Sequence, residues 1–139
     1  VIIESPGFLP NETGLRNLML LADMSGKVDK ATARRAMVTL GLGPDEKKPV
    51  GKYSLGQRQR LGFAQAFMEN PDVLILDEPF NAMDKASMEE VHDLLQQFKR
   101  DGKTIILASH SAADIEKACD IVYEMENGNL NVIRDKTVN

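Results

Sequence analysis

The strongest constraint on the fold of this 139-residue chain comes from two short apolar runs with an amphipathic segment between them. Residues 73–76 are all apolar, and residues 104–108, TIILA, form the second run. Between them, Met88, Val91 and Leu95 recur at helical spacing. Apolar strands that alternate with helices are typical of a parallel sheet covered by helices on both faces. The sequence therefore predicts an α/β fold.

The first half of the chain predicts helices with clear start and stop signals. An apolar repeat that begins at Leu15 stops at Gly26, and Asp29 can cap a second helix. Ser54 can cap a third helix that ends before Pro71, because the residue before a proline avoids helical dihedral angles. These signals predict that a helical segment precedes the α/β part.

The predicted elements divide the chain into three parts. Residues 1–12 are a strand followed by a loop, residues 13–70 form a helical subdomain, and residues 71–139 form an α/β core. Within the core, the pair Asn127-Gly128 predicts the turn of a β-hairpin.

Composition excludes some functions. The net charge is −4 and basic residues form no stripe, so nucleic acid is not an expected partner. The single cysteine, Cys119, cannot form an internal disulfide, and its apolar helical neighbours indicate a buried structural thiol. The chain has no apolar run of about 18 residues, the minimum for a transmembrane helix.

Two carboxylates follow the first apolar run directly. Asp77 and Glu78 stand at the carboxyl end of a predicted strand, where ligands bind in open α/β sheets. A carboxylate in this position can hold Mg²⁺, mostly through water. A second carboxylate can accept the proton of an attacking water as a general base. The alternative is that both residues only solvate a strand end.

Other polar positions have both functional and structural explanations. His110 follows Ser109 at the end of the second apolar run, where it could donate a hydrogen bond to a γ-phosphate, although a lone histidine can also be a surface or capping residue. Asp84 can be a helix N-cap, and a second role could coexist with that one. His92 lies among polar residues and is expected to be a solvated surface side chain.

Residues 53–60, YSLGQRQR, have the chemistry of a phosphate site at a helix start. The free N–H groups of a helix N-terminus favour an anion, Ser54 adds a hydroxyl, and Gly56 allows the backbone to approach closely. Arg58 and Arg60 can contact phosphate or acids, or can be solvated. The 139 residues contain no glycine-rich loop that ends in Lys-Ser/Thr, so this is half of a nucleotide site.

These motifs together resemble those of the nucleotide-binding domains of ATP-binding cassette (ABC) ATPases. Residues 53–57 resemble the signature motif, and residues 73–79 resemble the Walker B strand with its catalytic glutamate. Residues 81–84 resemble the D-loop, and Ser109-His110 resembles the H-loop. The motifs occur in the family's order, which makes the set far more specific than any one of them. The resemblance implies a P-loop NTPase-like parallel sheet with a helical subdomain.

The resemblance also implies roles for individual residues. In this family two domains enclose two ATP molecules head to tail, and the signature helix of one domain closes over the γ-phosphate held by the other. The implied catalytic residues are Glu78 and His110; the implied ATP-binding residues are Ser54, Leu55, Gly56, Gln57 and Asp84; the implied metal ligands are Asp77 and Glu4.

Two departures from the family pattern bear on the type of transporter. The family has Gln at the position of Glu4 and Gly at the position of Leu55. The chain carries Glu4, a Pro-Gly-Phe-x-Pro-Asn-x-Thr-Gly run at residues 6–14 and a Ser-Leu-Gly signature at residues 54–56. This combination resembles the bacitracin and lantibiotic type of export and self-protection ATPases. This resemblance implies a peripheral protein at the cytoplasmic face of the membrane, with transmembrane permease subunits as partners and export of a peptide antibiotic or a similar compound.

We expect the chain to be the later part of a longer ATPase and to be inactive alone, because the family's Walker A loop precedes the position of Val1. The absence of that loop's strand should expose an edge of residues 104–108. Two alternatives stay open at this stage. One is an ABC ATPase that acts in translation or DNA repair; the other is a non-catalytic interaction module that keeps the fold.

Overall fold

The structure is a computed structural model that describes residues 2–3, 7–81 and 83–138. The predicted metal ligand Glu4 and the D-loop residue Ala82 lie outside the described residues. The helices are α1 (Gly14–Ser25), α2 (Lys30–Thr39), the 3₁₀ turn η1 (Val50–Lys52), α3 (Leu55–Met68), α4 (Lys85–Arg100) and α5 (Ala112–Ala118). The strands are β1 (Ile2–Ile3), β2 (Val73–Asp77), β3 (Thr104–Ala108), β4 (Ile121–Glu126) and β5 (Asn129–Asp135).

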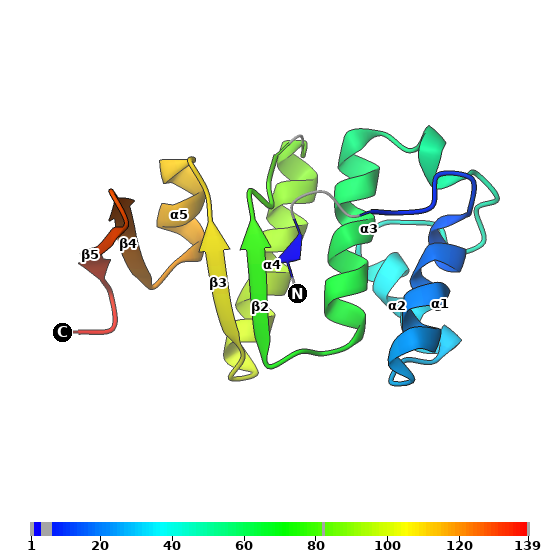
Figure 1. Cartoon of the computed structure of the whole chain (residues 1–139), viewed down its shortest axis with the longest axis horizontal. Helices are drawn as coiled ribbons and strands as arrows, with labels where there is room; N and C mark the ends of the chain where they lie inside the picture. Colours follow the sequence, from blue (N-terminus) through cyan, green and yellow to red (C-terminus); the bar gives the residue numbers. More distant parts are fainter. Residues whose placement is uncertain (1, 4–6, 82, 139) are drawn as a thin grey trace.

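The described residues form a parallel sheet in the order β1-β2-β3 (Figure 1). In the register of this sheet, Ile75 pairs with Ile106 and Asp77 pairs with Ala108. Because β2 and β3 run in the same direction, their polar continuations emerge at the same edge. The predicted α/β fold is confirmed. β3 lies at the end of the described sheet, so one of its edges is unpaired there, as expected from the sequence.

The helix boundaries follow the predicted capping signals. Thr13, Asp29 and Ser54 each accept a hydrogen bond from a backbone N–H in the first turn of α1, α2 and α3. Gly26 ends α1 with a φ of 64°, and Gly41 follows α2 with a φ of 66°, the left-handed conformation that favours glycine. Local side-chain chemistry therefore determines where each helix begins and ends.

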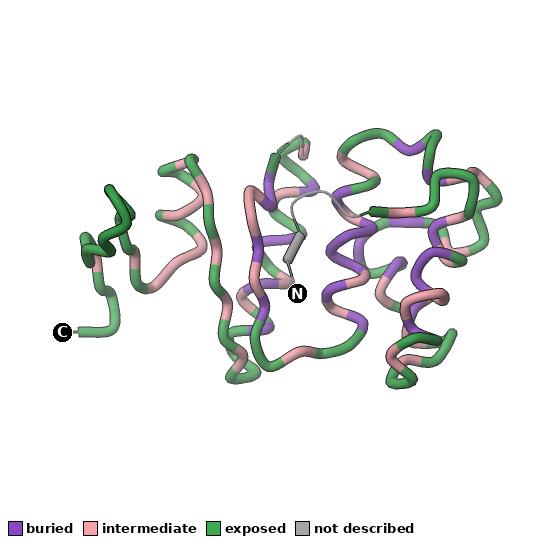
Figure 2. Tube along the Cα trace, in the orientation of Figure 1, coloured by how far each residue is buried: buried purple, intermediate pink, exposed green. Residues whose placement is uncertain are grey.

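One hydrophobic core joins the helices to β2. Its fully buried members include Leu18, Met37, Phe63, Leu74 and Val91, which come from α1, α2, α3, β2 and α4. Figure 2 shows the buried positions concentrated along α1, α3 and β2. Because this core is continuous, the division at residues 13–70 and 71–139 stays a prediction.

The expectation that helices cover both faces of the sheet is met on one face only within the described residues. Ile105 and Leu107 of β3 pack against the core, whereas Ile106, on the other side of the strand, is 54% exposed. The β4–β5 hairpin, which turns at Asn127-Gly128 as predicted, is also largely exposed (Figure 2).

A short ladder of hydrogen bonds holds the segment that leads into α3. The N–H of Val50 donates to the carbonyl of Glu12 at 2.9 Å, and the N–H of Gly51 donates to the carbonyl of Pro10 at 2.8 Å. A Cβ atom at Gly51 would lie 2.9 Å from that Pro10 oxygen, so the close approach requires glycine. The ladder fixes the position of Tyr53 and thereby the start of α3.

Within the described part of the chain, none of the helices has both the length and the apolar character that crossing a bilayer requires.

Candidate functional site

The carboxyl ends of β2 and β3 bring four predicted residues to one edge of the sheet. Asp77 is the last residue of β2, and Glu78 follows it. Ser109 and His110 follow β3. The N–H of Glu78 donates to the carbonyl of Ala108 at 2.9 Å, which extends the strand pairing by one more bond. The parallel register is therefore what places the acidic pair beside the histidine.

The carboxylate of Glu78 contacts the segment that follows β3. Its Oε1 accepts a hydrogen bond from the backbone N–H of His110 at 2.9 Å and lies 3.5 Å from Nε2 of the same residue. The hydroxyl of Ser109 lies 3.5 Å from Oε2. The Glu78 side chain is 24% exposed, whereas the imidazole of His110 is fully exposed. The carboxylate is thus held on one side and open to solvent on the other.

Glu78 has an unusual backbone conformation. Its φ is 45°, in the left-handed region that side chains other than glycine rarely adopt. The N–H of Asn81 donates to the carbonyl of Glu78, and the N–H of Met83 donates to that of Phe80, both at 3.2 Å. Such outliers cluster at functional sites, where the surrounding structure maintains the strain. The turn aims the Glu78 carboxylate at the edge of the sheet.

The donor set at this edge fits Mg²⁺ held mainly by water and phosphate. Mg²⁺ in nucleotide sites takes only one or two carboxylates from the protein. Asp77 offers one such carboxylate at the strand end. In the described ranges, no group of three or more His, Cys, Asp or Glu side chains could form an all-protein metal site.

The start of α3 forms a capping box at the predicted signature motif. The hydroxyl of Ser54 accepts from the N–H of Gln57 at 3.1 Å, and Oε1 of Gln57 accepts from the N–H of Ser54 at 2.9 Å. Ser54 is exposed, and Leu55 is 57% exposed. The Ser54 hydroxyl hydrogen stays available for donation, because its oxygen acts as the acceptor in the cap. This helix end is therefore preformed and accessible.

Asp84 is the N-cap of α4. Its carboxylate accepts a hydrogen bond from the N–H of Ser87 at 2.8 Å. Hydrogen bonds from Ser87, followed by the charge of Arg60, lower the pKa of Asp84 below its ordinary value. The structural role of Asp84 is therefore seen directly, and its ATP-binding role stays a prediction.

The signature residues at the start of α3 and the polar residues that follow β2 and β3 lie at the same end of the molecule, but among the residues that the structure describes they do not contact one another through hydrogen bonds or ion pairs. In Figure 1, α3 begins at the end toward which the arrows of β2 and β3 point. Within the described residues, no hydrogen bond or ion pair links Ser54 to Asp77, Glu78 or His110. One buried side chain, Gln59, connects α3 to the segment after β2, since its Nε2 donates to the carbonyl of Pro79.

Sequence reasoning gave no role to Gln59, although a signal was present. Gly62, Phe63 and Ala66 follow it at helical spacing, and all three are buried. A polar residue on that stripe must find a buried partner.

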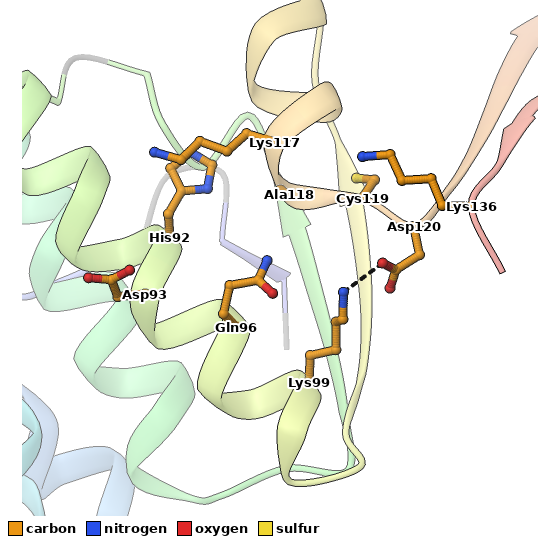
Figure 3. A pocket seen from close by; sticks show the side chains of 9 residues that line it. All are labelled: His92, Asp93, Gln96, Lys99, Lys117, Ala118, Cys119, Asp120 and Lys136. Carbon is orange, nitrogen blue, oxygen red and sulfur yellow. Dashed lines mark hydrogen bonds and ion pairs between the residues drawn. The ribbon is translucent and has the colours of Figure 1, made fainter.

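A hollow of about 280 Å³ lies between α4, α5 and the end of β5 (Figure 3). Three lysines line it, and each already has a partner. Lys99 pairs with Asp120 at 2.6 Å, Lys117 pairs with Glu89 at 2.5 Å, and Lys136 donates to the Glu116 carbonyl at 2.9 Å. Two of the three lysines are thus neutralised by a carboxylate, and Lys136 is held by a neutral carbonyl. The expectation that Cys119 is a buried thiol is met only in part, because Cys119 follows α5, a helix without fully buried residues, and is itself half-buried. This burial raises the pKa of the thiol, which makes it less reactive.

The expectation that His92 is a solvated surface residue is wrong. His92 is only 4% exposed, and its ring stacks on that of Phe80 with 4.4 Å between the centroids. Its position on α4 follows Val91, and the aromatic partner comes from the turn after β2, which the local sequence pattern does not reveal. Tertiary packing decides the burial of this residue.

Burial of His92 predicts a loss of stability in acid. Burial, and next Lys117, lower the pKa of His92, while Asp114, Glu89 and Asp93 oppose this effect. Below about pH 6.5 His92 therefore binds a proton in the unfolded chain more readily than in the folded state. The free energy of unfolding decreases as the pH is lowered. We expect the urea midpoint of the full-length protein to fall less between pH 7.5 and 5 in a His92→Phe variant. Equal pH slopes for both proteins would contradict the prediction.

Comparisons with known proteins agree with the motifs. A family model described as ABC transporter matches residues 1–81. The bacitracin transport ATP-binding protein BcrA of Enterococcus faecalis is 41% identical over 130 residues, which cover 93% of this chain and 42% of the relative. The lantibiotic transport ATP-binding protein SrtF of Streptococcus pyogenes is 34% identical over 129 residues, which cover 93% of this chain and 56% of the relative.

Solved structures share the fold. The dimeric post-hydrolysis state of the ATP-binding cassette MJ0796, bound to ADP and Pi, aligns with a TM-score of 0.81 at 20% identity, covering 96% of this chain and 63% of that one. A second dimeric structure of MJ0796 gives a TM-score of 0.78. The chain spans 42 to 60% of the length of the first curated relatives that it matches.

Proposed function

The chain belongs to the ABC transporter family, and from this premise we propose that the protein it forms part of hydrolyses ATP to drive export of a peptide antibiotic or a similar compound. The observation that carries the proposal is the contact between Glu78 and His110 at the edge of the sheet, next to Asp77. Packing of the core does not require two acids and a histidine together at the carboxyl ends of the strands, so their presence there favours a chemical role.

In the proposed reaction Glu78 is the general base. Its partly exposed carboxylate accepts a proton from a water that attacks the γ-phosphate. His110, whose exposed imidazole lies beside that carboxylate, donates a hydrogen bond to the phosphate oxygens as charge develops on them. Asp77, and Glu4 outside the described residues, would hold Mg²⁺, and the ion would neutralise phosphate charge.

The start of α3 serves an ATP molecule on a second nucleotide-binding domain. Ser54 supplies a hydroxyl donor, and Leu55, Gly56 and Gln57 supply the first turn of a helix whose free N–H groups favour phosphate. Asp84 contributes at the same interface. The support is the exposed and preformed capping box, together with the dimeric form of the related cassette MJ0796.

The proposed cargo and partners rest on the relatives. The names of BcrA and SrtF describe bacitracin transport and lantibiotic transport. We extend both to this protein as export of a peptide antibiotic, coupled to transmembrane permease subunits at the cytoplasmic face of the membrane. Residues 13–70 then form the helical subdomain, and residues 71–139 belong to the catalytic core.

Transport into inside-out vesicles tests the proposal. The full-length protein is co-purified with its membrane partner and reconstituted, and ATP-dependent uptake of labelled bacitracin and of a labelled lantibiotic is measured. We expect uptake of one of them with ATP and none with a non-hydrolysable analogue. Recovery of the protein with ribosomes or DNA, and no vesicle uptake, would point instead to a non-transport ATPase.

A further inference from the structure

Gln59 makes a buried hydrogen bond between two segments that have separate proposed roles. Its side chain is 6% exposed, and its Nε2 donates to the carbonyl oxygen of Pro79 at 3.1 Å across 20 positions of sequence. A buried amide without a hydrogen-bond partner destabilises the folded state. This contact therefore resists separation of the two segments.

At one end of the contact, α3 is a rigid element. Gln59 lies five residues after Ser54, whose capping box begins the helix. Leu61, Phe63 and Ala64 are completely buried on the same helix. A displacement at Ser54 therefore moves Gln59 with it, because close-packed helices shift as units.

At the other end, the turn after β2 is equally rigid. Pro79 is fully buried, and it lies between Glu78 and Phe80. Hydrogen bonds within residues 78–83 close this turn, and the ring of Phe80 stacks on His92. A shift of the Pro79 carbonyl is thus passed to the adjacent Glu78, whose strained φ of 45° is maintained by the structure around it.

We infer that Gln59 is a positioning residue that couples the two ATP sites of the dimer. This inference rests on the proposed function, in which Ser54 meets ATP on the partner and Glu78 acts on ATP of its own domain. Closure of α3 on the partner's ATP moves Pro79 through Gln59 and orients Glu78 for proton transfer. The coupling is reciprocal for binding, so the state of one site alters the affinity of the other.

The test compares Gln59→Met with Gln65→Met in the full-length protein. Methionine keeps the length of the side chain but removes the amide donor. Gln65 lies on the same helix, is partly buried, and makes no side-chain hydrogen bond to any residue that the structure describes. The rate of ATP hydrolysis is measured as a function of ATP concentration. The affinity for ATP of a single domain is measured separately, under dilute conditions in which the dimer does not form.

We expect Gln59→Met to lower kcat about five- to tenfold and to reduce the Hill coefficient from about 2 to about 1, with single-site ATP affinity unchanged. Gln65→Met should match the wild type. If Gln59→Met does not fold, Gln59→Asn, whose amide is one methylene too short, takes its place. An unchanged Hill coefficient and kcat, or a wild-type Hill coefficient of about 1, would overturn the coupling. A wild type that hydrolyses no ATP would overturn the proposed function instead.

Discussion

Replacing Glu78 with Gln in the full-length protein should reduce ATP turnover by about 10² to 10⁴-fold while ATP binding stays intact. The amide oxygen of glutamine can still accept the hydrogen bond that His110 donates to Oε1 of Glu78 at 2.9 Å. The geometry of the turn is therefore kept, and the capacity to accept a proton is lost. Steady-state hydrolysis and equilibrium binding of labelled ATP measure the two effects separately.

Glu90→Gln is the matched control for this variant. Glu90 is exposed on α4 and lies outside the strand edge, so its substitution removes one negative charge without touching the site. We expect near-normal turnover from it. If Glu78→Gln keeps more than about a tenth of the wild-type rate, Glu78 is not the general base.

Most elements of the fold could be predicted because their signals are local. A side-chain cap at Ser54, a left-handed glycine at Gly26 and a turn at Asn127-Gly128 each act within a few residues, and each occurs where the sequence indicates. The juxtaposition of Asp77 with Ala108 could also be predicted, because parallel strands end at the same edge.

The features that could not be predicted depend on contacts between distant segments. His92 is buried because Phe80 covers its ring, and Gln59 is buried because the Pro79 carbonyl meets its amide. Both partners belong to the turn after β2, whose path is set by the left-handed conformation of Glu78. A helical pattern reports which side of a helix is apolar, and it does not report which polar group has a buried partner.

The position of Leu55 refines the interpretation of the signature motif. Leucine replaces the flexible glycine of the family pattern, yet it fits as the first residue of α3 and its side chain points largely into solvent. The helix start is thus stabilised by the capping box between Ser54 and Gln57 and does not need backbone freedom at Leu55. We therefore attribute the proposed phosphate contact to Ser54 and to the free N–H groups of the first turn.

Replacing Ser54 with Arg should abolish ATP-driven dimerisation of the full-length protein. The exposed start of α3 would then carry a long side chain where the partner's phosphate must approach the first-turn N–H groups. The hydroxyl donor is lost as well, and a hydrogen bond to a charged group is worth about 1.5–3 kcal/mol, which is about 10- to 10²-fold in affinity. We expect dimer affinity to fall at least about 10²-fold when it is measured by light scattering with ATP in the Glu78→Gln background, where ATP is not consumed.

Two controls separate this block from a simple loss of helix capping. Ser54→Ala removes the cap and the hydroxyl but adds no bulk, so it should weaken the dimer less than Ser54→Arg does. Asp29→Ala removes the equivalent cap from α2, so it should lower stability slightly and leave dimerisation unchanged. If Ser54→Arg still dimerises with ATP as the parent does, the start of α3 does not meet the partner's phosphate. The exposed capping box is then only the end of a helix.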